Sequence, residues 1–187
     1  MAAHVQTRAQ PISDPPIRIR LICLACSRAQ LAQYRRWAEV LSESAELIAV
    51  DLPPSAFQAT SAELARSLAE RLRPYLETPH ALFGQSQGAL AALALAQLAQ
   101  RIWPGQTRHL FVAGCDSPNA ASRPDTAVQV PMTVVYPPGA LATMLGWNPL
   151  AGRGLELIEL AASGVDDPVF SERIVRIFNT HLGLLSL

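Results

Sequence analysis

The sequence predicts an α/β fold in which a mostly parallel β-sheet carries helices on both faces. Segments with the pattern of buried strands alternate with helical segments along the whole chain. The strand segments read as nearly continuous apolar runs, which is typical of strands that a parallel sheet buries on both sides. A length of 187 residues fits one domain with a substantial core. We therefore expect a single domain over residues 17–187, preceded by a flexible tail over residues 1–16.

The N-terminal half opens with a predicted strand over Ile17–Cys26, where an alternating pattern changes into an apolar run. A helix over Ala29–Leu41 follows, because its apolar residues recur at helical spacing. Glu46–Val50 is predicted as a short strand that two prolines terminate. The next helix, Ser61–Leu76, places leucines on one face and has Ser61 as its expected N-cap.

The C-terminal half continues the same alternation up to the last helix. Stretches rich in loop residues separate its elements at Cys115–Gln129 and Pro137–Gly154. In parallel sheets ligands bind at the carboxyl ends of the strands, so the residues that follow each strand are the first candidates for a site. The predicted elements are strands over His80–Phe83, His109–Ala113, Val130–Tyr136 and Leu155–Leu160, and helices over Gly88–Gln100 and Asp167–Leu182.

Composition excludes several classes of function. Acidic and basic residues balance at 15 each, whereas a nucleic-acid-binding protein normally has a basic excess, so we expect no nucleic-acid partner. Half of the residues are hydrophobic, which argues against intrinsic disorder. No apolar run approaches the roughly 20 residues that a membrane-spanning helix needs, and residues 1–16 lack the apolar stretch of a secretory signal. We therefore expect no membrane association.

The three cysteines, Cys23, Cys26 and Cys115, are too few for a disulfide framework, and their number is odd. They suit a reducing compartment, so we expect a cytoplasmic location. Cys23 and Cys26 form a C-x-x-C pair, but no second pair and no nearby histidine completes a zinc site. We expect buried or half-buried thiols and no metal ion.

The segment Gly84-Gln85-Ser86-Gln87-Gly88 lies between a predicted apolar strand and a predicted apolar helix. In a G-x-S-x-G motif of this kind the serine occupies a tight strand-to-helix turn, and the glycines relieve the crowding of that turn. The serine hydroxyl then stands at the N-terminus of the helix, where backbone N–H groups and the helix dipole favour a developing anion. The alternative is a glycine-rich turn that only connects the strand to the helix. The context favours a nucleophile elbow, with Ser86 as the candidate nucleophile.

The segments around this motif also carry a family resemblance. They are the helical segment Tyr34-Arg35-Arg36-Trp37-Ala38, the strand Glu46–Val50 with its proline stop, the elbow segment Ala81–Leu90, and His109–Cys115. They are similar to the corresponding segments of the stand-alone (type II) thioesterases of polyketide and nonribosomal-peptide pathways. The resemblance covers about Ile17 to Pro118, and the remainder only in outline. It implies an α/β-hydrolase-like fold.

The resemblance also implies a reaction and a partner. In that family the serine attacks an acyl group held as a thioester on the phosphopantetheine arm of a carrier protein, and water then releases the acyl group. An acyl carrier or peptidyl carrier protein is therefore the implied partner of Ser86. No cofactor bound by the chain itself is implied, because the thioester arrives on the arm of the carrier protein.

The sequence departs from the family at positions on which catalysis or access depends. The turn at residues 136–140, where family members carry an acid, holds no carboxylate. Asp167 or a neighbour occupies the position of the family's histidine. The turn that helps to form the oxyanion hole contains Cys26 and Ser27, and with Gln87 these are the expected oxyanion or pocket residues. The long helical lid between the fourth and fifth predicted strands is largely missing.

A serine nucleophile needs a base, usually a histidine that a carboxylate orients. The four histidines are His4, His80, His109 and His181, and we expect all of them at the surface or at the edges of elements. His80 lies six residues before Ser86 on the same strand. At ~3.3 Å per residue it is about 20 Å away, at the wrong end of the sheet. We therefore expect no histidine to serve as the base.

Asp116 follows the strand after the nucleophile helix, where thioesterase domains fused to synthases often keep their acid. It is either an orienting carboxylate or the cap of a turn before Ser117-Pro118, and the sequence leaves both readings open. Asp51, Asp166 and Asp167 also follow strands. A carboxylate with an ordinary pKa of about 4 is a poor base at neutral pH, so none of them replaces a histidine well.

The sequence leaves two main functions open. The first is a thioesterase-like hydrolase that keeps some acyl-transfer activity through Ser86, with hydrolysis impaired. The second is a catalytically degenerate member of the family that binds a synthase, a carrier protein or its own copy. A lyase or cyclase on the same scaffold is a remoter alternative.

A missing lid would leave an apolar surface exposed near the mouth of the pocket. Large exposed apolar patches usually mark interfaces, so we expect a second chain, as in a homodimer, or a partner protein to cover this surface. The surface is formed by Leu141, Met144, Leu145, Trp147 and Leu150.

Overall fold

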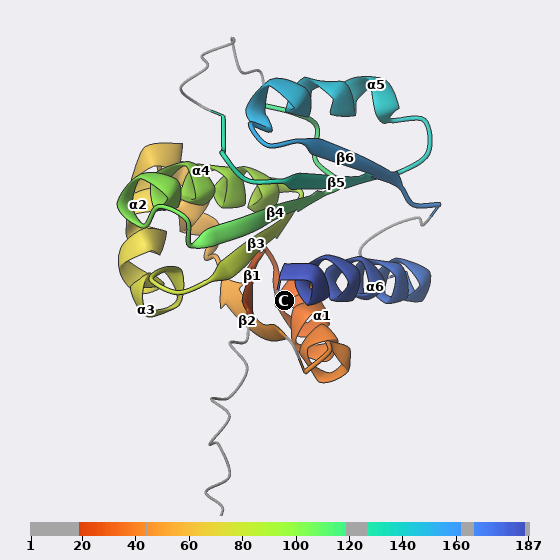
Figure 1. Cartoon of the computed structure of the whole chain (residues 1–187), viewed down its shortest axis with the longest axis horizontal. Coiled ribbons are helices and arrows are strands. Elements are labelled where there is room, and N and C mark those ends of the chain that lie inside the picture. Colours follow the sequence, from red (N-terminus) through yellow and green to blue (C-terminus); the bar gives the residue numbers. More distant parts are fainter. Residues whose placement is uncertain (1–18, 44, 119–126, 162–166, 186–187) are drawn as a thin grey trace, which may run out of the picture.

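The computed structural model describes residues 19–43, 45–118, 127–161 and 167–185, so the predicted tail over residues 1–16 lies outside the described residues. The strands within these residues form one sheet. All neighbouring strands are parallel, which confirms the predicted α/β class. The strands are β1 (Ile19–Ala25), β2 (Ala45–Asp51), β3 (His80–Gln85), β4 (Thr107–Ala113), β5 (Met132–Tyr136) and β6 (Leu155–Glu159). Their spatial order is β2-β1-β3-β4-β5-β6 (Figure 1).

Helices cover both faces of this sheet, as the sequence predicts (Figure 1). One face carries α1 (Arg28–Val40) and α6 (Pro168–Leu185). The other face carries α2 (Ser61–Arg71), α3 (Arg73–Leu76) and α4 (Gln87–Ile102). Among the helices of the described ranges, none combines the length and the apolar character that crossing a bilayer requires.

Aromatic rings fill much of the face under α1 and α6. The ring centroid of Phe178 on α6 lies 5.1 Å from those of both Phe83 on β3 and Phe111 on β4. Trp37 on α1 lies 5.8 Å from Phe178 in an edge-to-face arrangement. All four rings are buried, and such pairs add stability beyond the burial of their area. The cluster therefore ties both helices to the two central strands.

The opposite face is aliphatic, and α4 packs on it through small residues. Ala89, Ala92 and Ala96 recur at helical spacing and are buried in one cluster with Leu82 of β3 and Val112 of β4. Small side chains allow a helix to approach its neighbours closely. Because α4 follows β3 after one residue, its N-terminus lies at the carboxyl edge of the sheet.

The predicted helix over residues 61–76 is divided into α2 and α3. Leu72 separates them, with φ −100° and ψ 6°. Pro74 explains the division, because proline has no N–H and its ring would collide with the carbonyl group of Glu70 in a continuous helix.

The N-cap of α2 is Thr60, and the expectation of Ser61 as the cap is wrong. The Thr60 hydroxyl accepts a hydrogen bond from the Glu63 N–H at 3.3 Å, and the Glu63 carboxylate accepts one from the Thr60 N–H at 2.9 Å. This reciprocal pair is a capping box. It satisfies two donors at the helix start, whereas Ser61 begins the helix itself.

The segment over residues 137–154 was expected to be a loop, but it contains the short helix α5 (Leu141–Met144) and a 3₁₀ helix over Leu145–Leu150. This segment folds back onto the sheet face that carries α4, where its buried side chains join the same apolar cluster. The indole N–H of Trp147 donates to the carbonyl oxygen of Cys115 at 3.1 Å, which anchors the segment beside the end of β4.

The exposed apolar surface of this segment is therefore smaller than the sequence predicts. Met144, Trp147 and Leu150 are at most 2% exposed, so the expectation is wrong for these three residues. Leu141 and Leu145 are exposed at 46% and 55%. Coverage of these two by a second chain stays a prediction. A lid between the fourth and fifth strands would lie within residues 115–129. Residues 119–126 lie outside the described residues, so the predicted absence of the lid stays a prediction.

Candidate functional site

Ser86 lies alone between the last residue of β3, Gln85, and the first residue of α4, Gln87. Its backbone has φ 53° and ψ −124°, and it is the one non-glycine residue with positive φ among the described residues. The Ser86 N–H donates to the carbonyl oxygen of Ala113 at the end of β4, at 3.0 Å. A non-glycine residue in this conformation costs about 1–3 kcal/mol and persists only where its surroundings enforce it. The turn thus has the strained geometry predicted for a nucleophile elbow.

Two glycines make this geometry sterically possible. A Cβ at Gly84 would overlap the carbonyl oxygen of Gly88, because β3 and α4 meet there at backbone contact. A Cβ at Gly88 would lie 2.6 Å from the carbonyl oxygen of Leu24 on β1. The crowding that the sequence predicts at these glycines is confirmed.

The elbow rests on a buried polar contact from the other face of the sheet. The Tyr34 hydroxyl on α1 donates to the side-chain carbonyl of Gln85 at 3.3 Å, and both residues are buried. Burial raises the pKa of Tyr34 far above its ordinary value, with smaller contributions from Cys23 and Cys26, so the phenol is neutral. Tyr34 also packs edge-on against Phe83 at 5.5 Å between centroids. Gln85, the residue before Ser86, is therefore held in place by α1.

The turn expected to form the oxyanion hole is partly occupied by a side chain of this chain. The Cys26 N–H donates to the side-chain oxygen of Gln30 at 2.8 Å. Ser27 is the N-cap of α1, and its hydroxyl accepts from the Gln30 N–H at 3.2 Å. In the described part of the chain, the N–H groups of Ser27 and Gln87 have no acceptor, and the latter belongs to the first turn of α4. Two of the three candidate donors are thus unengaged in the described residues, while the third, the Cys26 N–H, is engaged by Gln30.

The thiols beside the elbow are poor nucleophiles. Cys26 is half-buried, and its sulfur would lie 3.1 Å from a Cβ at Gly88. Burial raises the pKa of Cys26 to about 11, although the Gly88 N–H opposes the shift. Burial, and then the charge of Asp116, also raise the pKa of Cys115. Both groups are therefore protonated at neutral pH, and a thiol is far less reactive than a thiolate.

The half-buried or buried state expected for the cysteines is confirmed, and all three are free thiols. Within the described ranges, no three histidine, cysteine, aspartate or glutamate side chains gather into a set that could hold a metal ion.

His80 is the first residue of β3, at the edge of that strand as expected, but it is fully buried, so the expectation of a surface position is wrong for it. Its Nε2 lies 2.9 Å from the hydroxyl of Thr107, and its Nδ1 lies 2.8 Å from the carbonyl oxygen of Thr78. Burial lowers the pKa of His80 to about 4, so the ring is neutral at physiological pH. Its partner Thr107 is the first residue of the neighbouring strand β4. The sequence around His80 gives no sign of this contact, so its burial could not be predicted locally.

His109 is also buried, at 6% exposure, and it begins a polar chain that leads away from Ser86. Its Nε2 lies 2.8 Å from the Thr133 hydroxyl, which donates to the Glu156 carboxylate at 3.0 Å. Nε2 of His181 lies 2.7 Å from the same carboxylate. Burial, and then His181, lower the pKa of His109 to about 3. The expectation of an edge position is wrong for His109.

The described histidines therefore cannot reach the serine hydroxyl. His109 pairs with Ala81 on β3, whereas Ala113, four residues further along β4, pairs with Gln85. Four residues of strand correspond to about 13 Å. His4, the remaining histidine, lies outside the described residues.

Asp116 follows β4 at the carboxyl edge, as predicted, whereas Asp167 directly precedes α6. Asp116 is exposed and lies three residues after Ala113, the acceptor of the Ser86 N–H. Whether Asp116 orients a base stays a prediction. The Asp167 carboxylate accepts from the Val169 N–H at 2.8 Å and so caps the start of α6. At the position expected for a catalytic histidine, the chain thus has a helix cap.

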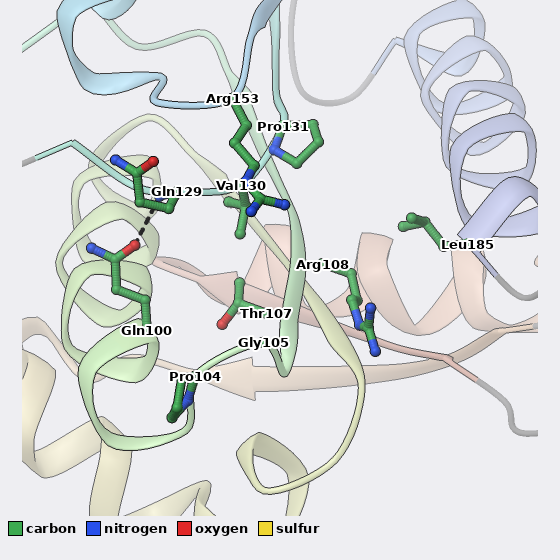
Figure 2. Close-up of a pocket in the computed structure, with 10 residues that line it drawn as sticks. All are labelled: Gln100, Pro104, Gly105, Thr107, Arg108, Gln129, Val130, Pro131, Arg153 and Leu185. Atoms are coloured by element: carbon green, nitrogen blue, oxygen red, sulfur yellow. Dashed lines mark hydrogen bonds between the residues drawn. The ribbon is translucent and has the colours of Figure 1, made fainter.

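A cavity of about 230 Å³ lies beside the elbow. Gln87, Leu90 and Ala91 of α4 form one wall, and Phe57 and Leu64 belong to the other. The lining is largely apolar, and its first residue on α4, Gln87, directly follows Ser86. A second cavity, of about 430 Å³, lies at the opposite edge of the sheet, where the strands begin (Figure 2).

Comparisons with known proteins indicate the family of the chain. A family model described as Thioesterase domain matches residues 19–135. The linear gramicidin dehydrogenase LgrE of Brevibacillus parabrevis is 32% identical over 92 residues, which cover 46% of this chain and 35% of that protein. The medium-chain S-acyl fatty acid synthase thioesterase of Rattus norvegicus is 27% identical over 118 residues, covering 59% and 45%. This chain therefore spans less than half the length of these curated relatives.

A solved structure extends the similarity to the whole fold. The RedJ thioesterase from the prodiginine pathway of Streptomyces coelicolor superposes with a TM-score of 0.69 at 20% identity, covering 92% of this chain and 97% of that one. The α/β-hydrolase-like fold expected from the sequence is confirmed.

The close approach at the elbow predicts the effect of adding a single methyl group. Gly84→Ala and Gly88→Ala should each lower the free energy of unfolding by about 3 kcal/mol, because backbone atoms cannot move aside. Gly183→Ala is the matched control, since a Cβ there meets nothing within 4 Å in α6. It should gain up to about 1 kcal/mol from helix propensity. Urea unfolding followed by circular dichroism measures all three, and an unchanged Gly88→Ala would contradict the described packing.

The buried histidines predict a loss of stability in mild acid. An unfolded histidine takes up a proton near pH 6.5, whereas folded His80 does so only near pH 4. The unfolded chain therefore binds more protons between these values, and stability falls as pH decreases through this window, by up to about 3 kcal/mol for His80. His80→Gln should show a shallower decline in urea unfolding between pH 6.5 and pH 4. Identical slopes for the two proteins would count against the assigned pKa.

Proposed function

The chain belongs to the thioesterase domain family, and from this membership we propose that it accepts acyl groups at Ser86 from the carrier proteins of a polyketide or nonribosomal-peptide synthase and releases them slowly. The observation that carries the proposal is the strained backbone of Ser86 at the N-terminus of α4, enforced by two glycines at backbone contact. Strain of this kind is retained where the serine has a chemical task.

The surroundings of Ser86 suit an acyl thioester. Attack by the hydroxyl on the thioester carbonyl would place the negative charge near the N–H groups of Gln87 and Ser27, which have no acceptor in the described residues. The apolar cavity that begins at Gln87 suits the hydrocarbon chain of a short acyl group. The names of two similar proteins, a gramicidin-pathway protein and a prodiginine-pathway thioesterase, support a carrier-protein pathway as the setting.

Slow release follows from the missing base. The chain has four histidines, and the three in described residues are engaged away from Ser86. Without a triad, serine hydrolases keep an acceleration of about 10³–10⁴ over water from the oxyanion hole and binding. Loss of one oxyanion donor costs a further factor of about 10²–10³, and here Gln30 engages the Cys26 N–H. We therefore expect an acceleration below about 10²-fold.

A second candidate function is binding without turnover. The hydrogen bond from the Cys26 N–H to Gln30 and the cap formed by Asp167 favour it, because both place structural roles where catalytic ones are expected. In this alternative the chain holds the phosphopantetheine arm of a carrier protein or docks on a synthase. We also propose a cytoplasmic setting for either function, on the basis of three free thiols, and a homodimer or partner contact over Leu141 and Leu145.

Steady-state hydrolysis tests the proposal directly. Wild type, Ser86→Ala and the control Ser55→Ala should be compared on acetyl and hexanoyl thioesters of a carrier protein; Ser55 is an exposed serine before α2. We expect wild-type rates below about 10²-fold over buffer, since the hydroxyl has no base, and Ser86→Ala should lose the part of this small rate that passes through an acyl group on Ser86. Fast wild-type turnover that Ser86→Ala abolishes would show that another group deprotonates Ser86.

A binding measurement separates the two candidates. Immobilised carrier protein bearing its phosphopantetheine arm should retain wild type and Ser86→Ala equally in the binding-only case. Intact-mass detection of an acyl group on Ser86, absent from Ser86→Ala, would instead support acyl transfer.

A further inference from the structure

The cavity of about 430 Å³ at the amino edge of the sheet lies away from Ser86 and is independent of the proposed function. It opens between the starts of β4, β5 and β6, next to the C-terminal ends of α4 and α6 (Figure 2). Its volume lies within the range of about 300–1,000 Å³ typical of small-molecule sites. Among the described residues that line it, none is an aspartate or a glutamate.

Two arginines supply the charge of this cavity. Arg108 is the second residue of β4, Arg153 lies in the turn before β6, and both residues line the cavity (Figure 2). The ion pairs in the described residues use other cationic side chains: Arg20, Arg73, Arg176 and His181. Within those residues, neither Arg108 nor Arg153 has a carboxylate partner. The cavity therefore carries two positive charges in a chain whose net charge is zero.

The remaining walls are held in place by hydrogen bonds and packing. The side chain of Gln100 donates to the carbonyl oxygen of Ala127 at 3.2 Å and accepts from the Gln129 N–H at 2.8 Å. Thr107 is buried, with its hydroxyl 2.9 Å from His80. Hydrogen bonds thus hold these walls in place, and the two guanidinium groups are the charged donors among the described lining residues.

We propose that this cavity binds a phosphorylated small molecule. Arginine is suited to phosphate because its planar N–H groups form paired hydrogen bonds with phosphate oxygens. A phosphate ester carries close to two negative charges at neutral pH, which matches Arg108 and Arg153, whereas one carboxylate would neutralise only one of them. Val130, Pro131 and Leu185 give the site an apolar side for the body of the molecule.

Titration calorimetry with inorganic pyrophosphate at physiological salt tests the site in the full chain. Arg108→Gln and Arg153→Gln should each weaken binding about tenfold or more, because each removes a charged hydrogen-bond donor. Arg36→Gln is the matched control, since Arg36 is an exposed arginine on α1, outside the cavity. Its affinity should stay within about twofold of wild type. Circular dichroism confirms that each variant is folded.

Two further measurements test whether binding is independent of Ser86 and whether the cavity prefers phosphate to carboxylate. Ser86→Ala should bind pyrophosphate as wild type does, because the elbow lies at the opposite edge of the sheet. Succinate should bind more weakly than pyrophosphate. Absence of pyrophosphate binding, an equal loss in Arg36→Gln, or succinate binding of the same strength would overturn the proposal.

Discussion

The close contact between β3 and α4 is the constraint on which the site depends. Gly84 and Gly88 meet there with no room for a Cβ, and Gly88 also lies against the carbonyl group of Leu24 on β1. This contact leaves the chain a single residue in which to turn from strand to helix, and Ser86 takes the positive φ that the turn requires. The alanine-rich face of α4 allows the same close approach along the rest of the helix. The serine is thus presented at the carboxyl edge by this packing, together with the hydrogen bond from its N–H to the Ala113 carbonyl oxygen.

Around this serine, groups that could assist catalysis have structural partners instead. The Cys26 N–H binds Gln30, and the Asp167 carboxylate caps α6. His80 and His109 are bound to threonine hydroxyls inside the sheet. Burial keeps both imidazoles neutral, and their positions near the amino ends of β3 and β4 place them away from the edge where a base is needed. A nucleophile position without an activating base follows from these contacts taken together.

The sequence predicts the features that local patterns encode and misses those that depend on distant partners. The strands, the elbow and its glycines follow from apolar runs and from one short motif, so their positions agree with the structure. The burial of His80 depends on Thr107, 27 residues away, and that of His109 on Thr133, 24 residues away. Trp147 is buried because its segment folds back to the Cys115 carbonyl group. Gln30 could have been suspected as a competitor for the oxyanion turn, since it lies four residues after Cys26.

The central claim is that the elbow holds Ser86 in a reactive position without a base to activate it. Labelling with a fluorophosphonate, in which a serine oxygen displaces fluoride from phosphorus, measures that activation without any choice of acyl substrate. Intact-mass spectrometry of wild type and Ser86→Ala over a range of pH gives the labelling rate. The account predicts that Ser86 is labelled as slowly as ordinary surface serines. Rapid stoichiometric labelling of Ser86, with a rate that rises through an inflection near pH 6.5, the ordinary pKa of imidazole, would contradict it.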